Sequence, residues 1–189
     1  MNRWLTVFLF AAALCILPSM AGAQVDKFGK PDTVLAEIGK VDPMHWTITI
    51  SYTNDEQVVG LSVPLRMTAG LNRIVADSAV FIGGRVQNFA YNAFRADTAI
   101  QCVLLGMIAN FGGTAKRLEP GSGRLATIFV SSLDHKPIEK LVVDTTTVHP
   151  NNSLMAIADS VQGTPPDTTT VKERKDLEIV PVFISRVAK

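Results

Sequence analysis

Apolar and polar residues alternate along much of this chain with a period of two. The clearest case is Met44–Tyr52, in which tryptophan, isoleucine and tyrosine alternate with threonine and serine. Successive side chains of a β-strand point to opposite faces of the sheet. This stretch therefore predicts a strand of an antiparallel sheet, with one face in the core and the other in water.

Further apolar stretches of similar length follow, separated by turns that contain glycine, proline or asparagine. No segment keeps a helical period of 3.6 residues for longer than about two turns. About eight or nine short strands with turns between them predict an all-β fold, a β-sandwich of antiparallel strands. The predicted strands are Val34–Ile38, Met44–Tyr52, Gln57–Thr68, Ile74–Ile82, Ala99–Ala109, Leu125–Ser131, Ile138–Thr145, Leu154–Val161 and Leu177–Val187.

The fold is predicted to be organised around the stretch Gly121–Ser131. Gly121 and Gly123 indicate a flexible turn, because glycine tolerates positive φ values. The run that follows has apolar groups at both alternating sets of positions. We therefore expect a central strand covered on both sides, with Phe129 in the core.

Two prolines lie inside predicted strands, Pro64 and Pro181. Proline has no amide hydrogen to donate to a ladder, so each one indicates an edge strand or a bulge. Residues 44–189 are predicted to form a single β-sandwich domain with an exposed loop at 163–176. Residues 24–43 form an N-terminal extension or a first strand.

Residues 1–23 have the three parts of a secretory signal peptide. Arg3 supplies the positive charge, Leu5–Leu17 is an apolar run too short for a comfortable membrane span, and Ala21-Gly22-Ala23 matches a cleavage site. We expect a secreted protein, extracellular or periplasmic, with no membrane span after signal cleavage. A retained membrane anchor is the alternative.

Cleavage would remove Cys15 and leave Cys102 as the remaining cysteine, so no intramolecular disulfide is expected. Cys102 lies in an apolar strand and is predicted to be a small buried hydrophobic side chain. Stability must then come from the core, for which an apolar content of 47% is sufficient. The formal net charge is +1 and no lysine or arginine cluster occurs, so the pattern of a nucleic-acid-binding protein is missing.

The sequence has no pattern typical of catalysis or of a metal centre. His45, His135 and His149 have no second ligand at metal-binding spacing, and no nucleophile or phosphate-binding motif is present. The acidic residues are scattered and form no calcium loop. We predict that the protein is not an enzyme and that it has no catalytic residue, cofactor or metal. A calcium ion held by carboxylates distant in sequence remains an alternative.

Three aromatic residues, Phe89, Tyr91 and Phe94, lie among polar residues in Val86–Asp97, a segment without a clean period. Exposed rings could stack on sugar faces, since they offer a large contact area at a low entropy cost. The structural alternative is that they anchor an irregular connection onto the sandwich. These three residues are the candidate ligand-binding residues.

Three stretches resemble strands of a known family, the cohesin domains. Gly121–Val130 reads G-S-G-R-L-A-T-I-F-V, Val58–Leu65 reads V-V-G-L-S-V-P-L, and Ile74–Gly83 reads I-V-A-D-S-A-V-F-I-G. The similarity extends roughly over Met44–Val187. The resemblance implies a jelly-roll β-sandwich, a fold similar to that of carbohydrate-binding modules.

Cohesins bind dockerin modules and so assemble enzymes or surface proteins outside the cell. The resemblance therefore implies a secreted, non-catalytic module that mediates protein–protein attachment to a dockerin-like partner. The alternative is a carbohydrate-binding module that recognises a polysaccharide through the three aromatic residues. No position matches a motif specific enough to assign dockerin contacts.

Overall fold

The computed structural model describes residues 28–109, 117–149, 151–159 and 177–188. Within these ranges the chain forms β-strands and no helix. The predicted signal peptide at 1–23 and the predicted loop at 163–176 lie outside the described residues. The strands are β1 (Thr33–Lys40), β2 (His45–Asn54), β3 (Val58–Thr68), β4 (Ile74–Val80), β5 (Tyr91–Asp97), β6 (Cys102–Ile108), β7 (Gly121–Ser132), β8 (Val142–Thr145), β9 (Met155–Ala158), β10 (Glu178–Ile179) and β11 (Val182–Val187).

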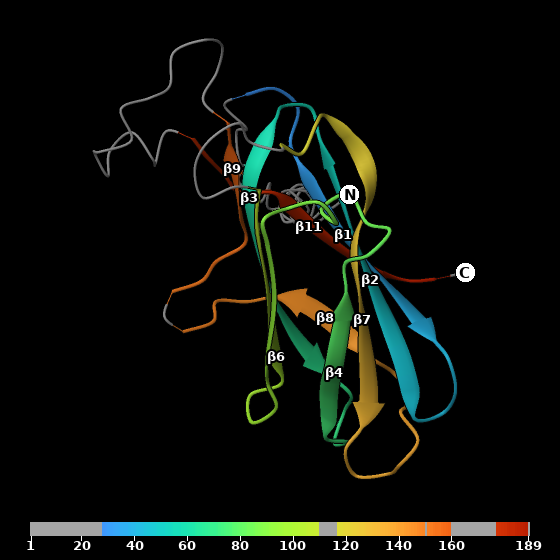
Figure 1. Ribbon diagram of the computed structural model, residues 1–189. Helices are drawn as coiled ribbons and strands as arrows, with labels where there is room; N and C mark the ends of the chain where they lie inside the picture. Colours follow the sequence, from blue (N-terminus) through green and yellow to red (C-terminus); the bar gives the residue numbers. More distant parts are fainter. Residues whose placement is uncertain (1–27, 110–116, 150, 160–176, 189) are drawn as a thin grey trace, which may run out of the picture.

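The strands form two sheets that pack against each other (Figure 1). The five-stranded sheet has the order β11-β1-β2-β7-β4, and the six-stranded sheet has the order β10-β9-β3-β6-β5, with β8 also paired to β3. The predicted all-β sandwich is confirmed. One pairing departs from the antiparallel expectation, because β11 runs parallel to β1. The chain reaches β11 by crossing from the other sheet, where β10 lies, and not through a hairpin.

More strands form than the eight or nine predicted, for two local reasons. The segment without a clean period contains β5, which pairs along its whole length with β6. The last predicted strand is divided at Pro181 into β10, in the six-stranded sheet, and β11, in the five-stranded sheet. Both are edge strands, as the proline indicated.

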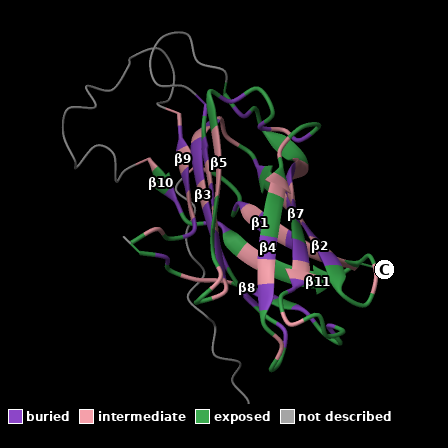
Figure 2. Cartoon of the chain, turned by 60° about the horizontal axis from the view of Figure 1, so that its bottom comes forward, coloured by how far each residue is buried: buried purple, intermediate pink, exposed green. Residues whose placement is uncertain are grey.

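The core lies between the two sheets. In β2, Trp46, Ile48, Ile50 and Tyr52 are buried, while the threonine and serine residues between them are half-buried, as the alternation predicted. Each large side chain that is fully buried contributes roughly 1.5–3 kcal/mol to folding. Figure 2 shows buried segments along the strands of both sheets and exposed segments in many of the turns. Facing β2 across the interior are Leu61, Val63, Leu65, Met67, Val103, Leu105 and Met107, all buried, from β3 and β6.

The strand β7 is central, as predicted, but its outer face is open to solvent. Phe129 lies on that face and is 41% exposed, so the prediction that it is in the core was wrong. The register of β7 against β2 shifts beside Ile50, which makes Leu125 an extra residue. Such a β-bulge turns two successive side chains to the same side. Leu125 and Ala126 are therefore both buried. Because they occupy successive positions, the sequence suggested apolar residues on both faces of the strand.

The strand β3 is not the edge strand that Pro64 suggested, since it lies between β6 and β9. Along the side of β3 away from β6, the partner changes from β9, which reaches Ser62, to β8, which begins opposite Leu65. Pro64 lies at this change, and its carbonyl accepts a hydrogen bond from the amide of Thr146 at 3.3 Å. Proline is tolerated here because no ladder donor is needed between the two partners.

Arg85, in the connection from β4 to β5, forms hydrogen bonds with backbone groups at one end of the five-stranded sheet. Its guanidinium donates to the carbonyl oxygens of Tyr52 at 2.9 Å, Gly121 at 3.0 Å and Glu119. Burial lowers the pKa of Arg85 from its ordinary value. A Cβ atom at Gly123 would lie 3.1 Å from Cδ of Arg85. Gly123 therefore leaves room for the arginine. Both glycines belong to the beginning of β7, which corrects the predicted turn.

Candidate functional site

The outer face of the six-stranded sheet carries apolar side chains and glycines in neighbouring positions. Gly60 lies opposite Ile108 on one side and Ile157 on the other, and Tyr91 lies opposite Ile108. Gly106 occupies the next row along the strands. We call this surface the apolar face and define it by Gly60, Ser62, Tyr91, Ala93, Leu104, Gly106, Ile108, Met155 and Ile157.

A shallow hollow of about 220 Å³ lies in the apolar face, and both glycines line it. A Cβ atom at Gly60 would lie 3.5 Å from Cδ1 of Ile157, and one at Gly106 would lie 3.9 Å from Cβ of Ala93. These are ordinary contact distances, so the backbone does not require glycine at either position. Glycine inside a strand weakens the strand. Because the two glycines have no side chain, they leave an open space between the surrounding aliphatic side chains.

Charged residues lie beside the apolar face and not within it. Arg95 is opposite Leu104, and Asp97 and Arg66 flank Cys102 at the same end of the sheet. On the apolar face itself, Tyr91 is 48% exposed and Ile108 is 36% exposed. An apolar centre with a polar rim is the arrangement found in protein–protein interfaces.

The structure separates the three aromatic residues that the sequence brought together. Phe89 is 9% exposed and belongs to the core, and Phe94 packs against the core from the inner side of β5. Tyr91 is three residues from Phe94 along the strand and so lies on the opposite, outer face. The three rings therefore do not form one ligand-binding surface. Phe89 and Phe94 fit the structural alternative, and Tyr91 alone stays a candidate binding residue.

Sequence reasoning missed most of the apolar face. Its members come from four strands and become neighbours through sheet pairing. The available signal was the two glycines, Gly60 and Gly106, each inside an apolar strand. An isolated glycine in such a position indicates a bulge or the close approach of another backbone or ligand. The sequence alone does not show that the two glycines share a face.

Cys102 is buried, as predicted, at the end of the apolar face where the charged residues lie. Its Sγ atom donates to the carbonyl oxygen of Ile100 at 3.4 Å. Burial raises the pKa of the Cys102 thiol, which keeps it in the unreactive protonated form.

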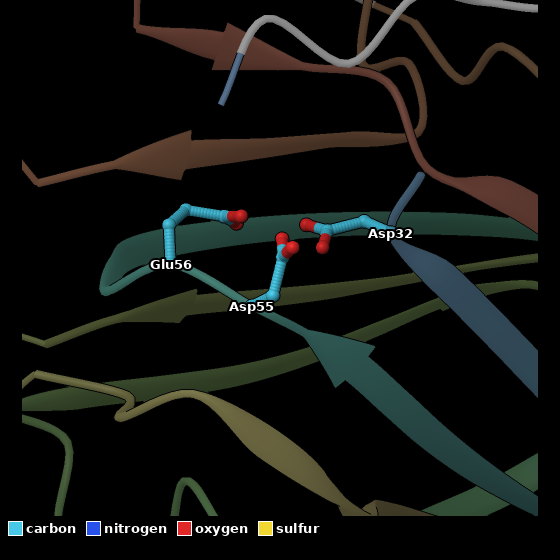
Figure 3. Close-up of side chains that lie close together, drawn as sticks. All are labelled: Asp32, Asp55 and Glu56. Atoms are coloured by element: carbon cyan, nitrogen blue, oxygen red, sulfur yellow. The ribbon is translucent and has the colours of Figure 1, made fainter. Parts of the chain in front are cut away.

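Three carboxylates meet where the chain enters β1, and these are the described residues whose oxygen atoms could share a cation. Asp32, Asp55 and Glu56 point toward one another in Figure 3, with donor atoms within 4.8 Å of each other. Oxygen donors suit a hard cation such as calcium. Asp32 accepts a hydrogen bond from the Tyr52 hydroxyl, and Asp55 accepts one from the amide of Lys30 at 2.9 Å. The hydrogen bond from Lys30 lowers the pKa of Asp55.

His45 lies at the opposite end of β1 and β2 from this group of carboxylates. His45 contacts Asp42, with Nδ1 2.7 Å from Oδ2, in the turn between β1 and β2. The other oxygen of Asp42 accepts hydrogen bonds from the amides of Met44 at 2.7 Å and His45 at 2.8 Å. The hydrogen bond with the His45 side chain is the main cause of a lowered pKa at Asp42. This arrangement closes a turn.

In the part of the chain that the structure describes, no helix has the length and apolar character needed to cross a membrane.

No family model and no curated protein matches this sequence. Among solved structures, the fold is similar to that of the seventh ScaB type I cohesin from Pseudobacteroides cellulosolvens. The TM-score is 0.58 and the sequence identity is 10%, over 83% of this chain and 92% of that one.

Two further similar structures are cohesins in complexes with dockerins. The OlpA cohesin from Clostridium thermocellum matches with a TM-score of 0.58 and 9% identity, over 84% of this chain and 100% of that one. The third ScaC cohesin from Acetivibrio cellulolyticus, in complex with the ScaB dockerin, matches with a TM-score of 0.55 and 13% identity, over 82% and 96%. At these identities the similarity establishes the fold, which is a cohesin-like jelly-roll β-sandwich, as the motifs predicted.

Proposed function

We propose that this cohesin-like chain is a non-catalytic binding module that attaches a second protein, a dockerin-like module, through its apolar face. The observation that carries the proposal is the hollow between Tyr91, Ile108 and Ile157, which the two glycines leave open. Two cohesins of similar fold were solved in complexes with dockerins, which supports a protein partner.

The physical basis is the burial of apolar surface. Covering such surface contributes roughly 25 cal/mol for each Å² removed from water. A protruding aliphatic side chain of the partner would fill the hollow, and the Tyr91 ring would cover it from one side. Tyrosine is enriched among the residues that contribute most to binding, often about 2 kcal/mol or more when truncated. Arg66, Arg95 and Asp97 would orient the partner from the rim.

We further propose that the module works outside the cytoplasm, as an extracellular or periplasmic protein. The support is the charged, apolar and small-residue pattern of residues 1–23. After cleavage Cys102 would be the remaining cysteine, so the folded module would not depend on an intramolecular disulfide in an oxidising compartment.

The experiment that tests the protein-binding proposal fills the hollow without touching the core. Gly106→Arg places a long charged side chain on the apolar face, where the neighbouring atoms leave room for a Cβ atom. Thr127→Arg is the matched control, because Thr127 is a half-buried residue of the central strand β7 on the outer face of the other sheet. Each variant and the parent are immobilised and exposed to secreted proteins of the source organism and to purified dockerin modules.

A protein retained by the parent and by Thr127→Arg, but lost from Gly106→Arg, would support the proposal. Isothermal titration of the purified partner should then give at least a hundredfold weaker affinity for Gly106→Arg. Retention that is the same for all three would place the binding site elsewhere. If no protein is retained by the parent, protein attachment is not the function.

A polysaccharide is the second candidate ligand, and the observation that favours it is the exposed Tyr91 ring on the outer face of the sheet. A sugar ring would stack on the tyrosine. Tyr91→Ala should then abolish retention on an insoluble polysaccharide, whereas Tyr91→Phe, which keeps the ring, should preserve it. Equal retention of Tyr91→Ala and the parent would exclude this function.

A further inference from the structure

The edge strands of the two sheets differ in how well their backbones are protected from pairing with another chain. A bulge between Ala76 and Ser78 interrupts β4, which also exposes Asp77. The edge strand β5 exposes Arg95 and Asp97. The strands β8 and β10 are four and two residues long. Bulges, exposed charges and short length are the features by which proteins prevent edge-to-edge association.

The edge strand β11 has a different character. It pairs with β1 in one uninterrupted register and contains no bulge. Val182 and Ile184 are nearly half exposed, and Val187 is 63% exposed. Its one charged residue, Arg186, is held by Glu37, with Nη2 2.7 Å from Oε1. Among the described residues, no strand pairs with the second side of β11. The strand β8 of the other sheet approaches β11 without pairing with it.

The backbone groups that face this open side can be identified. The amide of Val182 donates to the carbonyl of Asp32 at 2.8 Å, and the amide of Ala188 donates to that of Ile38 at 2.8 Å. In a parallel ladder, every second residue directs both its N–H and its C=O to the same neighbour. The backbone N–H and C=O groups of the even-numbered residues of β11 therefore point toward β1. Those of Phe183, Ser185 and Val187 point toward the open edge.

We propose that this edge pairs with β11 of a second copy of the chain, antiparallel and symmetric about Ser185. The two five-stranded sheets would then join into one continuous sheet across a two-fold axis. All three outward-facing residues form ladder hydrogen bonds in this register. Closed two-fold pairing also removes both open edges at once.

The side chains of β11 are complementary to themselves in this register. Phe183 lies opposite Val187 of the second copy, so the exposed valine gains an aromatic neighbour. Ile184 lies opposite Arg186 of the second copy, so no two like charges are directly opposed. Each Arg186 keeps its ion pair with its own Glu37. A partner strand with lysine or arginine opposite Arg186 would be repelled, whereas a second copy places Ile184 there.

The dimer is independent of the proposed partner binding, because β11 belongs to the five-stranded sheet and the apolar face belongs to the other sheet. Both apolar faces remain accessible in the dimer.

Sedimentation velocity of the purified protein over a range of concentrations tests the proposal. The parent should shift from the monomer mass toward twice that mass as concentration rises. Ser185→Pro removes an amide hydrogen that faces the open edge and not β1, so the monomer should keep its circular dichroism spectrum and dimerise at least tenfold more weakly. Ser185→Thr keeps the amide and is the matched control. If Ser185→Pro does not fold, Val187→Lys at the same edge replaces it and should weaken the dimer similarly.

The register has its own test. Residues that oppose each other in a hydrogen-bonded antiparallel pair have Cα atoms about 5.5 Å apart, which suits a disulfide. Ser185→Cys should form a cross-linked dimer under mild oxidation, and Ile184→Cys should not. A parent that is monomeric at every concentration would overturn the proposal, whether the edge is open or covered by another part of the same chain. A dimer that is insensitive to both edge variants, or that cross-links at 184 and not at 185, would also overturn it.

Discussion

The two sheets bury similar faces in a common core but present different faces to solvent. Outward from the five-stranded sheet point Thr47, Thr49, Ser51, Thr127 and Ser131, with Phe129 among them. Outward from the six-stranded sheet points the apolar face, with its two glycines. Where β2 and β7 lie side by side, the first surface is typical of a solvated antiparallel sheet. The exposed Val182 and Ile184 lie at its β11 edge.

The comparison of the two outer faces shows which side chains folding requires and which it does not. The inner faces must be apolar, since their burial drives folding. Nothing in the core requires Gly60, Gly106 or an exposed Ile108. Glycine costs roughly 0.5–1 kcal/mol relative to alanine inside a strand, and exposed apolar groups contribute no stability. A surface that departs from the solvated pattern at this cost is best explained by binding.

The sharpest test of the inner and outer faces compares two neighbours in β7. Ile128→Asp introduces an unpaired charge into the core and should destabilise the fold by more than about 4 kcal/mol. Phe129→Asp alters the solvated face and should cost less than about 1 kcal/mol. Urea denaturation measures both. Equal effects would mean that the strand faces are assigned incorrectly.

The aromatic residues next to the apolar face give the second largest expected effect. Phe89→Ala removes a buried ring and should cost about 3 kcal/mol. Tyr91→Ala removes a half-exposed ring and should cost less than about 1 kcal/mol, while it weakens partner binding. Thermal denaturation and a binding assay on the same samples separate the two roles. A severe loss of stability in Tyr91→Ala would show that the apolar face is structural.

Arg85, in the connection from β4 to β5, donates hydrogen bonds to the ends of β2 and β7, and its removal tests how much these bonds stabilise the fold. Arg85→Ala leaves the carbonyl oxygens of Tyr52 and Gly121 without their donor, which should cost about 2 kcal/mol. Arg85→Lys restores one donor at most and should fall between the parent and Arg85→Ala. Chemical denaturation measures the series. An unchanged midpoint for Arg85→Ala would mean that water replaces the guanidinium at no cost.

The smallest expected effect is a pH dependence at the turn between β1 and β2. Hydrogen bonds from His45 and Met44 lower the pKa of Asp42 below its ordinary value of 3.8. The ionised carboxylate therefore stabilises the folded state above this value, and the contribution is lost as the pH falls through the lowered pKa. Asp42→Asn should show a flatter stability profile than the parent below pH 3.8. Parallel profiles in acid would contradict the assignment.

The sequence predicted the parts of this molecule that depend on local alternation. The pattern of β2 placed Trp46 to Tyr52 in the core, and the cohesin-like motifs led to the right fold. The sequence-based prediction failed where one extra residue shifts the alternation of inward and outward side chains. The bulge at Leu125 reverses the faces of β7 downstream of it, so Phe129 was placed on the wrong side.

Properties that depend on pairing between strands distant in sequence could not be predicted from the sequence either. Pro64 indicates an edge in isolation, but the place where β9 gives way to β8 makes it acceptable in a central strand. The apolar face requires the register of four strands to be known. Tyr91 can be recognised as an outward ring only because the structure separates it from Phe89 and Phe94.

The parallel pairing of β11 with β1 also determines when the molecule can fold. Glu37 and Arg186, which join the two strands, are separated by 149 positions along the chain. Contacts between residues so distant in sequence form slowly, because a long loop must close before they are gained. A chain emerging from the ribosome cannot complete the five-stranded sheet until Val182–Val187 has been synthesised, so the module keeps an open edge at β1 through most of its translation.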